Sequence, residues 1–408
     1  MRKFYKLPFI YIAIFFLLLS LQTQKNANAQ WVQMSSGIGN NEYPQCLAST
    51  GSTILAGMSA LGVYRSTNNG ANWLTTSLNN QSIFSFYISG GTVYACTGNG
   101  IYTSTNSGET WSASYLTGTS ISCVIISGGF IHAGGAGVRT SSNNGVSWEQ
   151  TLASFTIVSL ASSGGSVFAA AVNSGVFKST NNGANFTLTS LSGVNPTTLL
   201  VSGSAIYAGT QFSGLYNTLN NGTNWTQVSA TLGAINSLVN QETYYFAGRD
   251  LNAGVWLSSN GGSTWVERNQ GFPGVPSVMA VCYHNGFMFA AAYGLSIWRR
   301  GYSEIIAPTS VYNVSNEVPD KFSLSQNYPN PFNPSTRINY ELKITNYVTL
   351  KVFDLQGKEV ASLVNERQSA GSYAVDFNTS DFSLPSGIYF YTLNAGEFTE
   401  TRKMILIK

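Results

Sequence analysis

Charged residues are scarce in this sequence, and so are histidine and cysteine. Asp, Glu, Lys and Arg together make up 9% of the 408 residues, and the chain has two histidines and four cysteines. So few bases exclude the cationic stripe that nucleic-acid binding requires. So few carboxylates and histidines leave little material for a metal site, and we expect no metal and no cofactor. The residues that are abundant include 41 glycines, which favour turns.

The chain has one long apolar run, at its beginning. It extends over Leu7–Leu21, about 15 residues, which is short for a bilayer span of roughly 20. Three bases precede the run: Arg2, Lys3 and Lys6. Ala27-Asn28-Ala29 comes after it as a small-x-small cleavage site. We predict a signal peptide over residues 1–29, cut between Ala29 and Gln30, with a retained anchor as the alternative. Without this segment the chain has 16 basic and 17 acidic groups.

An eight-residue pattern recurs six times and ends each time in an aromatic residue. The first copy is Ser66-Thr67-Asn68-Asn69-Gly70-Ala71-Asn72-Trp73. The third positions are Asn68, Asn106, Asn143, Asn181, Asn220 and Asn260, and the closing aromatics are Trp73, Trp111, Trp148, Phe186, Trp225 and Trp265. Successive third positions are 38, 37, 38, 39 and 40 residues apart. Strand-like segments at this period are typical of a β-propeller.

The repeat region divides into seven units, of which six carry the pattern. The last unit, Val278–Arg299, ends without it, and Gln30–Gln33 at the start resembles the segments that come directly after the closing aromatics elsewhere. We therefore predict that the first segment pairs with the last unit and closes the ring. The predicted fold is all-β, with a seven-bladed propeller over residues 30–300.

The eight-residue pattern resembles the Asp-box of bacterial-neuraminidase-type (BNR) repeats, Ser-x-Asp-x-Gly-x-Thr-Trp. This chain carries Asn where that family prefers Asp. The Asn side chain can still accept backbone N–H groups of its turn, and the glycine two residues later tolerates a left-handed conformation. In the family these turns lie on the outer rim, so the resemblance implies that the six Asn residues and the six aromatics are structural.

The four cysteines, Cys46, Cys96, Cys123 and Cys282, all lie in apolar strand segments. Cysteines at equivalent positions of non-neighbouring repeat units are too far apart to form a disulfide. We predict buried free thiols. A Cys46–Cys282 bridge stays open as an alternative, because the first and last units touch in a closed ring.

Beyond residue 300 the composition changes. Residues 31–300 contain 13 charged side chains and residues 301–408 contain 20. We predict a linker over residues 301–321, followed by a small antiparallel β-sandwich of the immunoglobulin-like kind over 322–408.

This tail resembles the type A C-terminal sorting domain of the type IX secretion system. The resemblance rests on residues 322–336, 352–358 and 386–390 and on the closing run 403–408. We single out as the sorting motif Tyr328, Pro329, Asn330, Pro331 and Phe332. The resemblance implies export through Sec and then through the type IX machinery of a Gram-negative bacterium. The cargo would reach the cell surface or the medium, and the tail would be removed.

The ring has few groups for catalysis. A glycosidase generally needs two carboxylates facing one cleft. Only Glu42 and the Arg249-Asp250 pair fall in loops of the expected ligand face, so we predict that the protein is not an enzyme. Of the two histidines, we expect His132 to pack within the sheet and His284 to lie in a hairpin turn.

The same loops hold amide and aromatic side chains that suit sugar or protein ligands. The candidate ligand-binding residues are Tyr43, Asn99, Asn173, Gln211, Phe212, Arg249, Asp250, Phe272 and Tyr293. The sequence therefore favours an exported, non-catalytic propeller that binds a glycan or a surface protein. A divergent sialidase-like glycoside hydrolase and an extracellular scaffold or assembly factor are the alternatives.

Overall fold

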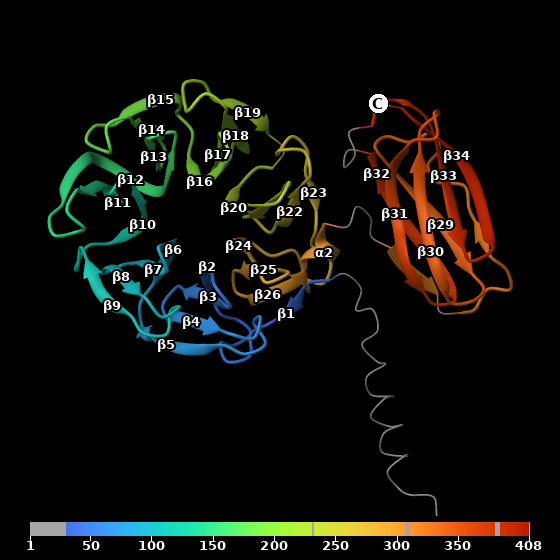
Figure 1. The fold of residues 1–408 in the computed structure, drawn as a ribbon, viewed down its shortest axis with the longest axis horizontal. Helices are drawn as coiled ribbons and strands as arrows, with labels where there is room; N and C mark the ends of the chain where they lie inside the picture. Colours follow the sequence, from blue (N-terminus) through green and yellow to red (C-terminus); the bar gives the residue numbers. More distant parts are fainter. Residues whose placement is uncertain (1–29, 231, 307–310, 316, 380–383, 408) are drawn as a thin grey trace, which may run out of the picture.

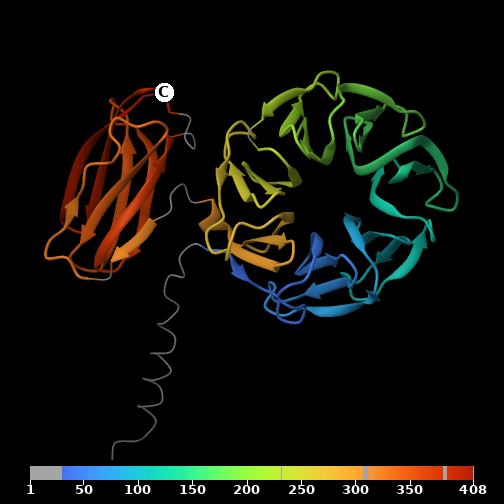
Figure 2. The same ribbon diagram turned by 180° about the vertical axis from the view of Figure 1, so that it is seen from behind.

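The computed structural model describes residues 30–230, 232–306, 311–315, 317–379 and 384–407. Within it a ring of β-sheets is followed by a second body of two sheets (Figures 1 and 2). The predicted signal peptide, including Ala29 of the cleavage site, lies outside these residues. No helix among the described residues has the length and apolar character needed to cross a membrane.

The ring consists of antiparallel sheets arranged side by side around a centre (Figure 1). The first two sheets contain β2 (Pro44–Thr50), β3 (Thr53–Met58), β4 (Gly62–Ser66) and β5 (Leu74–Asn79), then β6 (Ile83–Ser89), β7 (Thr92–Thr97), β8 (Gly100–Ser104) and β9 (Ser112–Tyr115). Two later sheets contain β16 (Pro196–Ser202), β17 (Ala205–Thr210), β18 (Leu215–Thr218) and β19 (Thr226–Ser229), then β20 (Ile235–Gln241), β21 (Tyr244–Arg249), β22 (Gly254–Ser258) and β23 (Val266–Glu267).

Between these pairs lies a six-stranded sheet with one shared strand. Its members are β10 (Ile121–Ser127), β11 (Phe130–Ser141), β12 (Glu149–Ser163), β13 (Ser166–Ala171), β14 (Gly175–Ser179) and β15 (Thr187–Ser192). The first part of β12 pairs with β11, and its second part, from Ile157 onward, pairs with β13. One continuous strand is therefore the outer strand of one repeat unit and the inner strand of the next.

The ring closes as predicted. The last sheet has the order β1 (Val32–Gln33), β26 (Ser296–Gly301), β25 (Phe287–Ala292) and β24 (Val278–His284). In it, Val32 pairs with Arg299 and Gln33 with Trp298. The inner strands β2, β6, β10, β12, β16, β20 and β24 contact one another in this order, and β24 returns to β2. The two ends of the ring are thus joined in one sheet, which leaves neither end with an unpaired edge there.

The eight-residue pattern forms the turn between the third and fourth strands of a unit, which we call the box turn. In all six copies the third-position Asn Oδ1 accepts a backbone N–H from four residues later, at 2.9 to 3.1 Å. The glycine two positions after it has a φ of 78° to 86°. Both observations agree with the predicted roles. Trp73 is fully buried, and the other five closing aromatics are partly buried.

Each box turn also packs on the preceding unit. A Cβ added at Gly183 would lie 2.6 Å from the His132 ring, and one at Gly222 would lie 2.6 Å from Phe168. His132 and Phe168 hold equivalent positions in their second strands, β11 and β13. The glycine is thus required for close packing between units as well as for the turn.

The linker prediction for residues 301–321 is wrong in two places. Tyr302–Ile305 forms the short helix α2, whose Tyr302 and Ile305 are buried in the core of the ring. Val311–Ser315 forms β27, which pairs with a strand of the tail. Tyr302 and Ile305 pack in the ring, and the backbone of Val311–Ser315 pairs with a sheet of the tail, so the segment is divided between the two bodies.

All four cysteines are free thiols, as predicted, although Cys282 is only partly buried, and the alternative Cys46–Cys282 bridge is not formed. Cys46, Cys96 and Cys123 are buried. Burial raises the pKa of Cys96 and Cys282 to about 12. These thiols therefore stay protonated and act as small apolar groups in the sheets.

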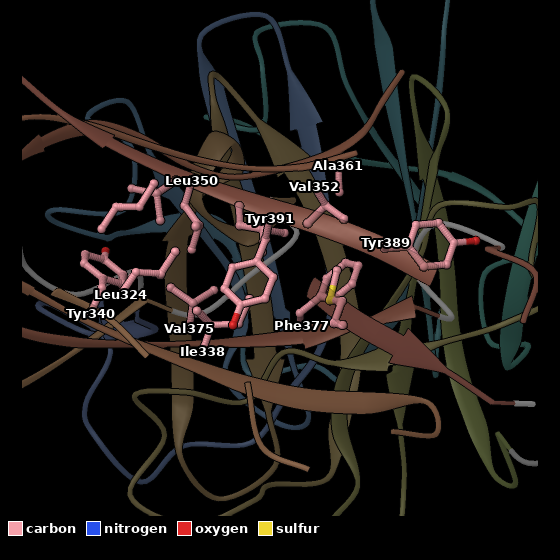
Figure 3. Close-up of a cluster of buried hydrophobic side chains, with 14 of the residues drawn as sticks. Leu324, Ile338, Tyr340, Leu350, Val352, Ala361, Val375, Phe377, Tyr389 and Tyr391 are labelled. Carbon is pink, nitrogen blue, oxygen red and sulfur yellow. The ribbon is translucent and has the colours of Figure 1, made fainter. Parts of the chain in front are cut away.

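The tail consists of two four-stranded sheets around one core (Figure 3). One has the order β27, β32 (Gly371–Asn378), β29 (Ser335–Leu342) and β28 (Ser323–Leu324). The other has the order β31 (Glu359–Gln368), β30 (Asn346–Phe353), β33 (Gly387–Ala395) and β34 (Phe398–Leu406). Side chains such as Ile338, Val375, Leu350 and Tyr391 meet between them. The predicted sandwich is thus an antiparallel pair of sheets.

Candidate functional site

The connections of the ring lie on two opposite faces, because neighbouring strands of each sheet are antiparallel. The box turns and the turns between first and second strands share one face. The loops between second and third strands share the other with those that enter the inner strands, and we call this the loop face. All nine candidate ligand-binding residues lie in these loops or directly beside them; Phe272 belongs to the long loop that enters β24.

Amide side chains on the loop face bond to the backbone of neighbouring loops and, in one case, to each other. Asn173 N–H donates to Asn195 Oδ1 at 3.0 Å, and Asn195 Nδ2 donates to Gln211 Oε1 at 2.5 Å. Asn99 Oδ1 accepts the N–H of Gly118 at 2.9 Å. These bonds hold neighbouring loops together, which gives the side chains of Asn99 and Gln211, and the backbone of Asn173, a structural task that the sequence did not reveal.

Arg249 and Asp250 are also used within the fold. The guanidinium of Arg249 lies 4.7 Å from the ring of Trp256 in a cation–π contact, and burial lowers its pKa while Glu267 opposes that shift. Asp250 Oδ1 accepts the N–H of Leu251 at 2.8 Å. Neither side chain forms an ion pair within the described parts of the chain. The carboxylate of Asp250 keeps acceptor capacity for a ligand.

The aromatic candidates behave in two ways. Tyr43 and Tyr293 pack against each other in an edge arrangement, with ring centroids 4.9 Å apart, and remain 46% and 59% exposed. Phe212 is exposed too. Phe272 instead stacks on Trp31 at 5.2 Å and packs edge-on against Trp298 at 5.1 Å. We therefore assign Phe272 to the packing of the ring.

The basic side chains near the box turns connect neighbouring units, which agrees with a structural role of these turns at the outer rim of the ring. Arg65 pairs with Glu109 at 3.4 Å. Lys178 Nζ donates to the carbonyl of Asn221 at 2.7 Å. Each bond crosses from one unit to the box turn of the next, which leaves these bases occupied in the structure of the ring.

Both histidines are buried. His132 packs in its sheet as predicted, with Nδ1 3.0 Å from Thr140 Oγ1, and burial lowers its pKa to about 4. His284 was expected in a turn, but it ends β24 and is 1% exposed, with Nδ1 2.8 Å from Ser49 Oγ. Among the residues with assigned positions, no three His, Cys, Asp or Glu side chains are grouped for a metal ion.

The second candidate site is the sorting motif of the tail, which lies against the end of β34. Asn330 Oδ1 accepts the N–H of Ile405 at 2.9 Å, and Phe332 N–H donates to the carbonyl of Ile405 at 3.0 Å. Ile407 N–H donates to the Phe332 carbonyl at 3.0 Å. The ring of Phe332 is buried in the core of the tail. The motif therefore covers the edge of the last strand.

The first motif residue, Tyr328, is exposed and directly follows a buried polar residue. The side chain of Tyr328 is 81% exposed. Asn327, directly before it, is buried and donates to Thr336 Oγ1 at 2.9 Å, while its N–H donates to Tyr391 OH at 2.8 Å. Burial raises the pKa of Tyr391 to about 12, so this hydroxyl stays neutral and bonded. A buried polar network thus presents Tyr328 to solvent.

Comparison with protein families identifies this second body. Residues 326–408 match the family of secretion system C-terminal sorting domains. The tail is a type IX sorting domain. Its presence indicates export to the cell surface or the extracellular space and interaction with the type IX machinery. The matched range includes Tyr328–Phe332 and the whole of β34.

Beyond the sorting domain, relationships appear in fold alone. No curated protein matches the chain by sequence. The extracellular domain of BT4673 from B. thetaiotaomicron is 13% identical with a TM-score of 0.57, covering 94% of this chain and 60% of that one. PorZ, a surface component of the type IX secretion system of Porphyromonas gingivalis, is 11% identical with a TM-score of 0.51, covering 91% and 60%. This chain thus spans 60% of the length of either.

A third similar structure is YCF48 from Cyanidioschyzon merolae. It is 14% identical with a TM-score of 0.53, and the alignment covers 68% of this chain and 99% of YCF48. A further YCF48 structure with a bound D1 peptide has a TM-score of 0.52 at 12% identity, with 68% and 96% covered. These similarities support a β-propeller fold for the part of the chain that precedes the sorting domain.

Some exposed side chains of the loop face could not be recognised from the sequence. Leu251 is 74% exposed and Val275 is 42% exposed. Both are aliphatic residues in loops, which a sequence gives no reason to separate from residues of a core. Their exposure depends on how the loops of adjacent units meet.

Proposed function

We propose that the ring is a non-catalytic binding module for a glycan or a protein, carried to the cell exterior by its sorting domain. The proposal includes a cleaved signal peptide over residues 1–29 and passage through Sec before the type IX machinery. The ring then acts at the surface or in the medium. The loop face is the proposed binding surface.

The proposed architecture is a seven-bladed propeller of Asp-box repeats. Counting the six-stranded sheet as two blades that share β12 gives seven inner strands. The six box turns agree in hydrogen bonding with the role we gave to the Asp-box, with Asn in place of Asp. The tail is proposed to be an immunoglobulin-like sandwich of type A.

One observation carries the binding proposal: the loop face exposes large apolar side chains. This face is opposite to the one at which the chain enters and leaves the ring. The Tyr43–Tyr293 pair, Phe212 and Leu251 are exposed there. Tyr302, where the chain leaves the ring, instead bonds to Gly286 and Gln241 in turns of the other face. Exposed apolar groups of this kind are characteristic of interaction sites. The sorting domain is attached where it does not interrupt the loop face.

The chemistry of the loop face favours binding over hydrolysis. Glu42 and Asp250 are its convincing carboxylates, and Asp250 already accepts a bond from its own turn. A glycosidase needs one carboxylic acid and one carboxylate on opposite sides of the scissile bond. The D1 peptide bound to YCF48 is a precedent for a protein ligand on a similar fold, and it supports the same choice.

The test is a binding screen with the chain without its signal peptide, residues 30–408, against polysaccharides, bacterial glycans and peptides. We expect saturable binding that Phe212→Ala or a Tyr43→Ala/Tyr293→Ala variant weakens about tenfold, the loss of roughly 1.4 kcal/mol. The Asn68→Asp variant on the opposite face is the matched control. Absence of any ligand would overturn the binding proposal. Release of product from a glycan, abolished by Asp250→Asn, would instead establish the hydrolase alternative.

A further inference from the structure

An apolar stripe crosses the loop face where the last units of the ring meet the first. Leu251 follows β21, Val275 precedes β24, Tyr293 follows β25, and Tyr43 precedes β2. Their side chains are 74%, 42%, 59% and 46% exposed, respectively. Since β20, β24 and β2 are neighbours in the ring, the four residues come from three adjacent units.

Hydrogen bonds join the loops of the stripe into one surface. Ser277 connects two of them: its Oγ accepts the N–H of Asn252 at 3.2 Å, and its carbonyl accepts the N–H of Tyr293 at 2.9 Å. The carbonyl of Glu42 accepts the N–H of Ser296 at 3.2 Å. The rings of Tyr43 and Tyr293 contact each other as well. The stripe is therefore held in place before any ligand arrives, which reduces the entropic cost of binding.

Within the four loop segments of the stripe, the charges have one sign. Residues 38–43, 250–253, 273–277 and 293–295 contain Glu42 and Asp250 and no lysine or arginine. In the described residues neither carboxylate takes part in an ion pair. The nearest base in sequence, Arg249, lies against Trp256. An anionic partner, such as an acidic glycan or an anionic lipid surface, is therefore disfavoured here.

The apolar side chains of the stripe further limit the kind of partner that it can bind. Leu251 and Val275 offer aliphatic surface, which suits the side chains of a peptide and provides no plane for stacking on a sugar ring. The faces of Tyr43 and Tyr293 can attract lysine or arginine through cation–π contacts. Apolar and cationic groups together in one ligand are characteristic of a basic, apolar peptide segment.

We infer that this stripe binds a protein partner through an exposed segment that combines apolar side chains with lysine or arginine. The inference rests on the proposed binding function and specifies its partner. Leu251 and Val275 contact the apolar side chains of the segment. Glu42 and Asp250 face its positive charges, and the two tyrosines contact both kinds of group.

The experiment uses the chain without its signal peptide, residues 30–408, and an array of synthetic peptides of about 12 residues, the length scale of extended recognition segments. Net charge and apolar content vary independently across the array, and neutral polysaccharides are tested in parallel. We expect binding to require both positive charge and apolar residues and to weaken as salt increases. Binding that follows charge alone, or that is strongest for acidic peptides, would overturn the inference.

Variants then locate the site. Tyr43→Ser/Tyr293→Ser should weaken peptide binding at least about tenfold, and Glu42→Gln/Asp250→Asn should remove most of its salt dependence. Tyr347→Ser, which changes a tyrosine of similar exposure in the sorting domain, is the control and should bind as the parent does. Peptide binding that the stripe variants leave intact would refute the inference.

The outcomes separate this inference from the proposed function. Binding of a polysaccharide but of no peptide would refute the basic, apolar partner and leave the binding module standing. If neither peptides nor polysaccharides bind, both statements fail.

Discussion

The ring of Tyr302 packs against the ring of Phe246, with centroids 6.2 Å apart. In most other units a box glycine packs on the residue equivalent to Phe246, as Gly222 does on Phe168. The last unit has no box turn, and α2 takes its place. The Tyr302 hydroxyl also donates to the carbonyl of Gln241 at 3.2 Å. The ring of sheets therefore ends after α2, beyond the predicted boundary at residue 300.

Removing this helix should destabilise the ring. We expect Tyr302→Ala to lower the free energy of unfolding by about 3 kcal/mol, the usual cost of deleting a buried aromatic ring. A chain ending at Arg300 should lose at least as much free energy of unfolding. A chain ending at Ile306 should be as stable as the ring in the parent chain. Urea unfolding of the three proteins checks this. Equal midpoints for the two truncated chains would show that α2 is not part of the ring.

His132 should make the stability of the ring depend on pH. Its pKa is lowered by burial from 6.5 to about 4, so the unfolded chain takes up a proton that the folded chain does not. Stability is then complete above pH 6.5 and is lost as the pH falls towards 4, by about 3 kcal/mol at about 1.4 kcal/mol per pKa unit. The pKa of His284 is also lowered by burial, so this residue changes stability in the same direction.

The variant that isolates this effect is His132→Phe, since Phe168 fills the same position in the next unit. We expect a smaller loss of stability between pH 7 and pH 4, measured by denaturant unfolding at each pH. If the slope of stability with pH equals that of the parent, proton uptake by His132 is not its source.

Ser296 stands where the other units have glycine with positive φ. Its φ is 63°, and its buried hydroxyl has no hydrogen-bond partner within the described structure. Ser296→Gly should raise the free energy of unfolding by about 1 kcal/mol, because a side chain is costly in the left-handed region and an unbonded buried hydroxyl adds to that cost. Thermal unfolding measures the change.

The reverse substitution elsewhere provides the control. At Gly175, with φ of 111°, an added Cβ would lie 2.1 Å from the carbonyl oxygen of Leu191. Gly175→Ser should therefore destabilise strongly. Ser296 is tolerated because the outer strand of its unit is the two-residue β1. A stabilising Gly175→Ser or a destabilising Ser296→Gly would contradict this account.

The sorting motif should separate into a supporting part and an exposed part. Asn330→Ala removes the acceptor for Ile405 N–H and should lower the stability of the sorting domain by about 1 to 2 kcal/mol. Tyr328→Ala should leave stability within about 0.5 kcal/mol, because that side chain is exposed. Unfolding of both variants measures this, and secretion assays follow. Reduced secretion of a stable Tyr328→Ala protein would identify direct recognition.

Much of the architecture was predictable because it depends on local, repeated features. The box turns are set by Asn and Gly at fixed spacing, and their hydrogen bonds run within five residues. The pairing of Val32 with Arg299 was also predictable, because a unit without its outer strand had to obtain one from the other end of the chain. The sorting domain was recognisable from short motifs that the family comparison confirmed.

The candidate site was less predictable, since exposure and pairing depend on loops from different units. Phe272 looked like a ligand contact but packs on Trp31, a residue 241 positions away in sequence. Leu251, an aliphatic residue to which the sequence assigned no role, is exposed. In both cases the chain supplies the residue type, and the neighbouring unit decides whether that residue is covered.

The repeat, its turns, the closure of the ring and the presence of a sorting domain could therefore be read from the chain alone, because each depends on residues close together or on a count of strands. The end of the ring, the exposure of loop residues and the edge that the sorting motif covers became clear only in three dimensions. These depend on contacts between segments far apart in the chain, as between Tyr302 and Phe246 or Asn330 and Ile405. Local patterns carry no information about such distances.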